Sequence, residues 1–341
     1  MIVVGIVVLV AFVAGLYRAR KERQEYTSFE TTLSVKGAFV ALVFCSHFRT
    51  YPTLIPFYDQ PIICICDYLG QMMVAMFLFY SGYGILESLK RKGPEYIQKF
   101  PQKRILKVLV QFDIAVLCFL ALGFFLGEQF SAKRVLLSLI AWDDLKNSNW
   151  YIFAILCAYV FSYLSFKWFK VKTALFMITL LSFAYIVVVS RFKGDYWWDT
   201  ILCFPAGLYY SYMKDSFELN LRKHYFAYFI VSFVAFVFVN HFCRLNYFIL
   251  GPLRSVLFCT FLTILLFKFP VNSALLKWLG SLVFPIYILQ RIPMILFKHF
   301  GLDSSYELYF VLCLATTLLL AKLFSLFFDK IEKWIPDLNS K

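Results

Sequence analysis

The sequence predicts an all-α, polytopic membrane protein that forms a single bundle of 10–11 transmembrane helices. Hydrophobic residues make up 61% of the 341 residues and aromatic residues 21%, whereas charged residues make up only 16%. About a quarter of the residues of a soluble globular domain are charged. Apolar runs of about 20 residues, long enough to cross a bilayer as a helix, also recur from one end of the chain to the other.

Eleven such runs are visible, and the gaps between them reach only about twenty residues, so that no gap holds a separate soluble domain. They cover residues 2–17, 36–56, 68–89, 105–126, 150–166, 173–190, 197–213, 225–243, 246–267, 275–297 and 305–328. The first run lacks a basic segment before it, and its charges follow at residues 18–23, the reverse of a secretory signal. We therefore expect a retained first helix.

The formal net charge of +14 follows the expected topology. With the N-terminus outside and alternating spans, 24 of the 34 Lys and Arg residues fall on inner segments and 10 on outer ones. Such an excess is the positive-inside rule, so the C-terminus is predicted to be cytoplasmic. The excess of basic residues thus indicates the orientation of the protein in the membrane, and we expect no nucleic-acid partner.

The second run carries two ionisable residues on one face. Lys36 and His47 are eleven positions apart, which is about three helical turns and roughly 16 Å along the axis. Lys36 is expected at the cytoplasmic boundary, and His47 toward the outer half. An interfacial histidine at a helix end is the plain alternative, but ionisable groups at such depth are functional candidates by default.

The third and fourth runs add a small pair and a basic pair. Ser81 and Gly82 follow large aromatic residues, where they either let helices pack closely or leave room for a slender ligand chain. Arg104 and Lys107 are three apart and share a face. They form either an ordinary positive-inside loop or a cytosolic phosphate clamp. Asp113 is the one acid well inside an apolar run; we expect it either to pair with His47 or to form a structural intramembrane ion pair with Arg254 or Arg291.

Metal and nucleotide chemistry receive no support. The four histidines form no HExxH spacing, and two of the nine cysteines form only an isolated Cys-x-Cys. No glycine-rich phosphate-binding motif is present. We therefore expect no metal site.

The order of these motifs resembles the acyltransferase-3 family of integral membrane acyltransferases. The similar stretches are Lys36-x10-His47, Phe77-LFYSGY-Gly84, Arg104-x-x-Lys107, Asn149-Trp150-Tyr151 and Leu279-GSLVFPIY-Ile288. Lys36 and Lys107 stand where the family usually has Arg, and Gln290 where many relatives have His. On this resemblance, residues 1–29 are an additional helix and basic loop, residues 30–330 the acyltransferase-3-like domain, and residues 331–341 a cytoplasmic tail.

The resemblance implies acetyl transfer from cytosolic acetyl-CoA to a hydroxyl of an envelope or exported polysaccharide, or of its lipid-linked precursor, at a bacterial inner membrane. His47 would be the catalytic group, as general base or acyl carrier, with Asp113 as its partner. Residues Lys36, Ser81, Gly82, Arg104 and Lys107 would hold the acyl-CoA. A non-enzymatic exporter of polysaccharide or lipid-linked sugar is the main alternative, and a family member that binds without turnover is the second.

Overall fold

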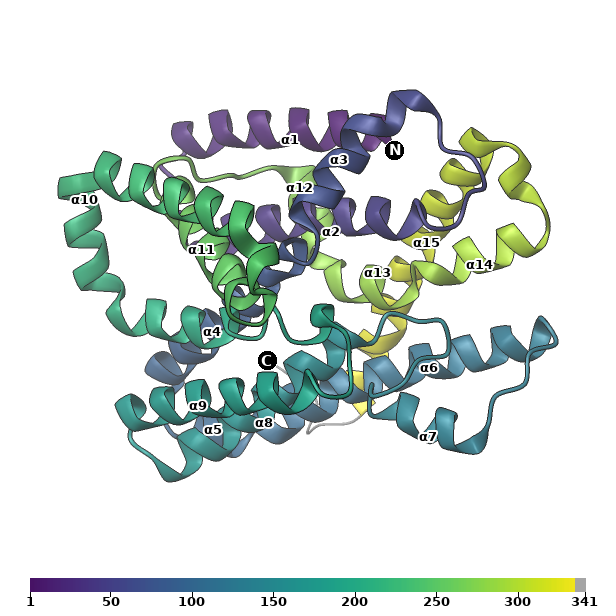
Figure 1. Ribbon diagram of the computed structural model, residues 1–341. Helices are drawn as coiled ribbons and strands as arrows, with labels where there is room; N and C mark the ends of the chain where they lie inside the picture. The colour runs from purple at the N-terminus through teal and green to yellow at the C-terminus, as the bar shows by residue number, and fades with distance from the viewer. Residues whose placement is uncertain (335–341) are drawn as a thin grey trace.

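The computed structural model describes residues 1–334, which form helices and turns without a strand (Figure 1). The last helix, α15 (Tyr306–Trp334), runs to the end of this range. The remainder of the tail expected at residues 331–341 lies outside the described residues. The all-α class is confirmed.

Within the described range, nine helices are long and apolar enough to cross a membrane, or ten if a bent pair counts as one span. Besides α15 they are α1 (Ile2–Lys21), α2 (Phe29–Phe48), α4 (Met72–Lys92), α6 (Lys107–Phe125) with the π-helical turn before it (Pro101–Leu106), α8 (Trp150–Trp168), α9 (Val171–Val189), α10 (Cys203–Phe242) and α11 (Tyr247–Lys268). The bent pair joins α12 (Ala274–Ser281) to α13 (Val283–Leu289) and α14 (Arg291–His299) at an angle of 58°.

Helix α10 contains two of the spans expected from the sequence. It is 40 residues long, and His224 within it has non-helical angles of φ −127° and ψ 35°. An unbroken helix of that length would measure about 60 Å, twice the thickness of the hydrocarbon core. The bend visible in Figure 1 therefore divides α10 into two halves, which correspond to the runs at 197–213 and 225–243.

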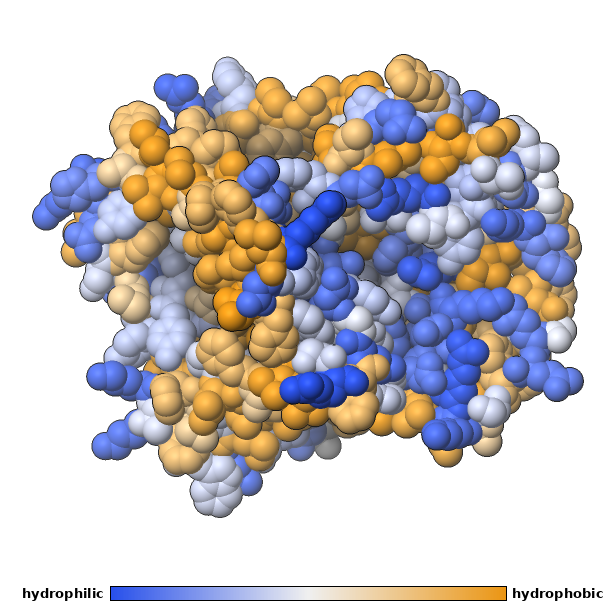
Figure 2. Space-filling view, viewed as in Figure 1, coloured by the Kyte–Doolittle hydropathy of each residue, from blue (hydrophilic) through white to orange (hydrophobic). Residues whose placement is uncertain are grey.

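The long helices lie side by side across the bundle. Figure 1 shows α1 and α2 running together along one edge, with α8 and α9 along the opposite edge. Short helices lie between the long ones in sequence: α3 (Gln60–Leu69), α5 (Glu95–Gln98) and α7 (Ala132–Leu139). Figure 2 shows apolar residues over much of the upper and lower left of one face, with hydrophilic residues gathered toward its right-hand part.

Two glycine pairs bring helices into backbone contact. Gly37 of α2 faces Gly280 of α12, and Gly82 of α4 faces Gly207 of α10. A Cβ atom built on any of the four would lie 1.9–2.1 Å from a backbone carbonyl oxygen of the facing helix. Small residues allow such close approach of membrane helices. These crossings fix how α2 and α4, the helices with the candidate motifs, are rotated in the bundle.

Candidate active site: two cavities and a tyrosine layer

Helix α2 places Lys36 and His47 as the sequence predicts. The helix begins after Ser28, whose hydroxyl oxygen accepts a hydrogen bond from the Thr31 backbone N–H at 3.2 Å. It stays regular to Phe48, so that Lys36 and His47 lie on one face at different depths. The Lys36 ammonium lies 5.7 Å from the centroid of the Tyr80 ring. No acidic residue of the described range pairs with this ammonium.

One end of the bundle contains a basic cavity of about 750 Å³. Its charged wall residues are five cations and one acid: Lys92, Lys99, Lys103, Arg104, Lys107 and Glu95. The Arg104 Nε–H donates to the Tyr96 hydroxyl at 3.2 Å, and Lys107 forms an ion pair with Glu332 of α15. Arg104 and Lys107 thus share one cavity, as their spacing predicts. Lys107 is partly neutralised, whereas Lys92, Lys99 and Lys103 add positive charge.

His47 lines a second cavity, of about 540 Å³, which we call the His47 cavity. Its polar wall comes mainly from the end of α2 and the residue after it, from α3, from the loop before α8 and the start of α8, and from α13 and α14: His47, Arg49, Asp67, Asp144, Asn147, Ser148, Asn149, Trp150, Tyr287 and Arg291. Asn149 is fixed there because its side-chain amide donates to the carbonyl oxygens of Ala141 and Asp143, at 3.1 and 2.8 Å.

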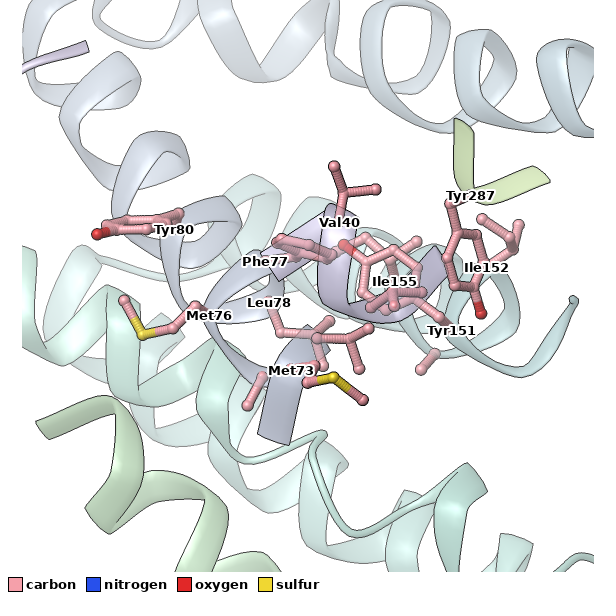
Figure 3. Packing of buried hydrophobic residues seen from close by; sticks show 14 of the residues in the cluster. Val40, Met73, Met76, Phe77, Leu78, Tyr80, Tyr151, Ile152, Ile155 and Tyr287 are labelled. Atoms are coloured by element: carbon pink, nitrogen blue, oxygen red, sulfur yellow. The ribbon is translucent and has the colours of Figure 1, made fainter. Parts of the chain in front are cut away.

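A buried tyrosine layer lies between the two cavities. Tyr159 lines the basic cavity, Tyr287 lines the His47 cavity, and the two walls share no residue. The ring of Tyr151 lies 5.4 Å from that of Tyr287 (Figure 3), and the side chain of Ser81 lies beside the hydroxyls of Tyr151 and Tyr159. Tyr151, Tyr159 and Tyr287 are buried, with exposures of 9%, 6% and 3%, and they join the wall that contains Arg104 to the wall that contains His47.

Gln290 is the polar partner of the His47 ring. Its side-chain nitrogen lies 2.9 Å from His47 Nδ1, and its Oε1 is buried without a hydrogen-bond partner. The two orientations of the amide fill the same volume. With Oε1 turned toward an Nδ1–H, the amide would hold the ring by Nδ1 and leave Nε2 free as a base. The sequence marked Gln290 only as a departure from the family pattern.

Two other predicted site residues lie elsewhere. The space beside Gly82 is filled by the backbone of α10, so its predicted role in holding the acyl-CoA gains no support. Asp113 Oδ1 is buried without a hydrogen-bond partner, and within the described residues no ion pair joins it to His47. Arg254, a suggested partner of Asp113, instead lies 3.5 Å from Asp199. The roles of Gly82 and Asp113 stay predictions.

The two cavities suit a transfer reaction between two substrates. The cations of the basic cavity can hold phosphate groups, and His47 presents an imidazole to a separate polar space. Among residues 1–334, no group of three or more His, Cys, Asp or Glu side chains is arranged to hold a metal ion.

Comparison with known proteins identifies the family of the chain. A family model described as an acyltransferase domain matches residues 3–326, from within α1 into α15, which is nearly the whole chain. Searches of curated proteins and of solved structures each returned no match. The matched region contains both cavities and the tyrosine layer. The chain therefore belongs to the acyltransferase-3 family and is a membrane acyltransferase.

Proposed function

We propose that this protein is an O-acetyltransferase that moves an acetyl group from cytosolic acetyl-CoA to a hydroxyl of an envelope or exported polysaccharide, or of its lipid-linked precursor. The observation that carries the proposal is the pair of cavities, one strongly basic and one lined by His47, at opposite sides of a thin tyrosine layer. Membership of an acyltransferase family favours this function over the exporter that intramembrane charges alone would also allow.

The basic cavity is the proposed donor site. CoA carries its negative charge on phosphate groups, and a concave wall with five cations and one acid attracts such a ligand. Arg104 is held by Tyr96, so its guanidinium is positioned to donate forked hydrogen bonds to phosphate oxygens. The excess of Lys and Arg on this side supports a cytosolic orientation for the cavity, with the N-terminus outside and the C-terminus inside.

The thioester end of acetyl-CoA must then pass the tyrosine layer. Ser81 lies in that layer beside Tyr151 and Tyr159, and Lys36 approaches Arg104 from α2. A slender, mostly neutral pantetheine arm fits a passage between aromatic side chains better than a charged group would. The proposal therefore requires these tyrosine side chains to move when the donor binds.

His47 is the proposed catalytic group. As a general base, its imidazole takes the proton of the acceptor hydroxyl while the hydroxyl oxygen attacks the thioester carbonyl carbon. The carbon–sulfur bond breaks, and the imidazolium returns the proton to the departing CoA thiolate. As a nucleophile, the imidazole would instead accept the acetyl group first and pass it to the hydroxyl in a second step. Gln290 holds the ring in either case.

Purified protein in nanodiscs tests the proposal with [14C]acetyl-CoA and membrane glycan from the source strain. We expect His47→Ala to abolish acetyl transfer while CoA binding persists. Arg104→Ala should raise the KM for acetyl-CoA by tenfold or more, since a charged hydrogen bond contributes about 1.5–3 kcal/mol. Lys172→Ala, an exposed change at the same end, is the matched control. Wild-type transfer by the His47 variant would refute the mechanism.

The two mechanisms leave different traces. After exposure to [14C]acetyl-CoA without acceptor, a covalent acyl-imidazole would retain label on the wild-type protein and not on His47→Ala. A general base would leave both unlabelled. Mass spectrometry of surface polysaccharide from a deletion strain gives the cellular test, because loss of O-acetyl groups is expected.

A further inference from the structure

Arg291 is a cation in the His47 cavity without an acidic partner. It begins α14 and lines the cavity together with His47 and Tyr287. Its charge acts on the imidazole of His47, so the two groups face the same region. No carboxylate of the described residues lies within ion-pairing distance of its guanidinium. Its side chain is half-buried, and a partly desolvated cation without a counter-ion favours an anionic ligand.

The other charges of this cavity are already paired. Arg49 forms an ion pair with Asp67, and both line the cavity. Asp144 lies 3.6 Å from Arg134, which belongs to α7. These two carboxylates are the only acids on the wall. Arg134 also lies 4.0 Å from Asp143, so the wall holds two cations and two carboxylates, and Arg291 is its one cation without an acid of the described residues within ion-pairing distance.

Three polar atoms of this wall are buried without a hydrogen-bond partner. They are Arg291 Nε, the Tyr287 hydroxyl and Ser148 Oγ, which come from α14, α13 and the loop before α8. All three can donate a hydrogen bond. Buried polar atoms are usually satisfied, so three unsatisfied donors on residues that line one cavity favour a ligand with several acceptor oxygens, which they would reach once the side chains turn toward it.

We infer that the acceptor of the acetyl group is acidic: a carboxylate or phosphate group of the acceptor binds Arg291, with Tyr287 and Ser148 beside it, while the neighbouring hydroxyl faces His47. This inference rests on the proposed function and narrows its acceptor class. A guanidinium binds either anion through two parallel N–H donors. A uronic acid would supply the carboxylate, and a lipid-linked sugar would supply the phosphate.

The competing role of Arg291 is stabilisation of the oxyanion that forms on the acetyl carbonyl, because it lies close to His47. The two roles differ in what they predict for binding. An acceptor-binding arginine discriminates between acidic and neutral acceptors before any chemistry. An oxyanion-stabilising arginine accelerates transfer to every acceptor, including water.

The test is a ligand-observed NMR titration of the full chain in nanodiscs with D-glucuronate, inorganic phosphate and D-glucose, carried out with saturating CoA so that the basic cavity is occupied and does not bind the added anion. Wild-type protein is compared with Arg291→Gln, with Arg291→Lys and with Arg191→Gln, an exposed arginine after α9 that lies outside the cavity wall. We expect wild type to bind glucuronate or phosphate at least tenfold more tightly than glucose. Arg291→Gln should lose that preference, Arg291→Lys should keep part of it, and Arg191→Gln should equal wild type.

Equal anion binding by wild type and Arg291→Gln, or no saturable binding of either anion to wild type, would overturn the inference. Slower acetyl-CoA hydrolysis by Arg291→Gln with unchanged anion binding would assign the oxyanion role instead. Glucuronate and phosphate as separate ligands distinguish a sugar carboxylate from a lipid-linked phosphate. CoA affinity, measured on the same preparations, should depend on Arg104 and not on Arg291. Failure of CoA binding would therefore count against the proposed function and leave the anion result unaffected.

Discussion

The glycine contact between α4 and α10 gives a quantitative prediction. A methyl group at Gly82 would lie 2.1 Å from the Phe204 carbonyl oxygen, whereas ordinary van der Waals contacts begin at about 3.4 Å. The helices would have to separate by the difference, roughly 1.3 Å, because the opposing atom is backbone and cannot rotate away. Overpacking of this kind costs about 1–3 kcal/mol, and the size of the overlap favours the upper end.

The helix propensity of alanine offsets part of that cost. Replacing a helical glycine by alanine stabilises a helix by about 0.5–1 kcal/mol. We therefore expect Gly82→Ala to lower the free energy of unfolding by about 2 kcal/mol. Gly84→Ala is the matched control on the same helix, since no heavy atom lies within 4 Å of its built Cβ. That variant should gain about 0.5–1 kcal/mol.

Unfolding of both variants in mild detergent, followed by circular dichroism during titration with sodium dodecyl sulfate, measures the difference. Acetyl transfer should fall in Gly82→Ala as well, because the neighbouring Ser81 belongs to the tyrosine layer. Equal stabilities for the two variants would show that α4 and α10 are not held together at this glycine.

Three further changes probe the site. Gln290→Ala should lower kcat about 10²-fold with little change in KM, because the His47 ring loses its orienting contact; an unchanged kcat would remove Gln290 from the mechanism. Lys36→Arg should keep or improve the affinity for acetyl-CoA, measured by titration, because arginine retains the charge and adds a forked pair of N–H donors. Complete loss of binding would contradict a role of Lys36 in binding acetyl-CoA. Asp113→Asn should leave kcat within about twofold of wild type, since Asp113 has no ionic contact with His47; a tenfold loss would restore its predicted catalytic role.

Much of the fold and part of the site follow from local sequence. The eleven apolar runs correspond to the spanning helices, once α10 is divided at His224 and α12–α14 are counted as one bent span. The spacing of Lys36 and His47 correctly placed both on one face of α2. Arg104 and Lys107 likewise share one cavity. These successes have one cause: hydropathy and helical periodicity act within a single helix.

Hydropathy and helical periodicity could not predict the contacts between helices. Gln290 approaches His47 across 243 positions of sequence, and Glu332 approaches Lys107 from the last helix. The shared face of Lys36 and His47 also gave no indication of the tyrosine layer, whose members come from α8 and α13. Each contact depends on how a helix is rotated and how deeply it sits, neither of which its own pattern specifies.

The sequence by itself determined that this chain is a helical membrane protein with basic residues concentrated at one side. Two effects decide this residue by residue: the burial of apolar side chains in lipid, and the cost of moving charges across it. Only the tertiary structure decided that Arg291 has no counter-ion, that Gln290 holds His47 and that Gly82 packs against α10. Those facts arise where backbones meet at glycine crossings, because close approach there fixes the rotation of each helix and hence the neighbours of every side chain.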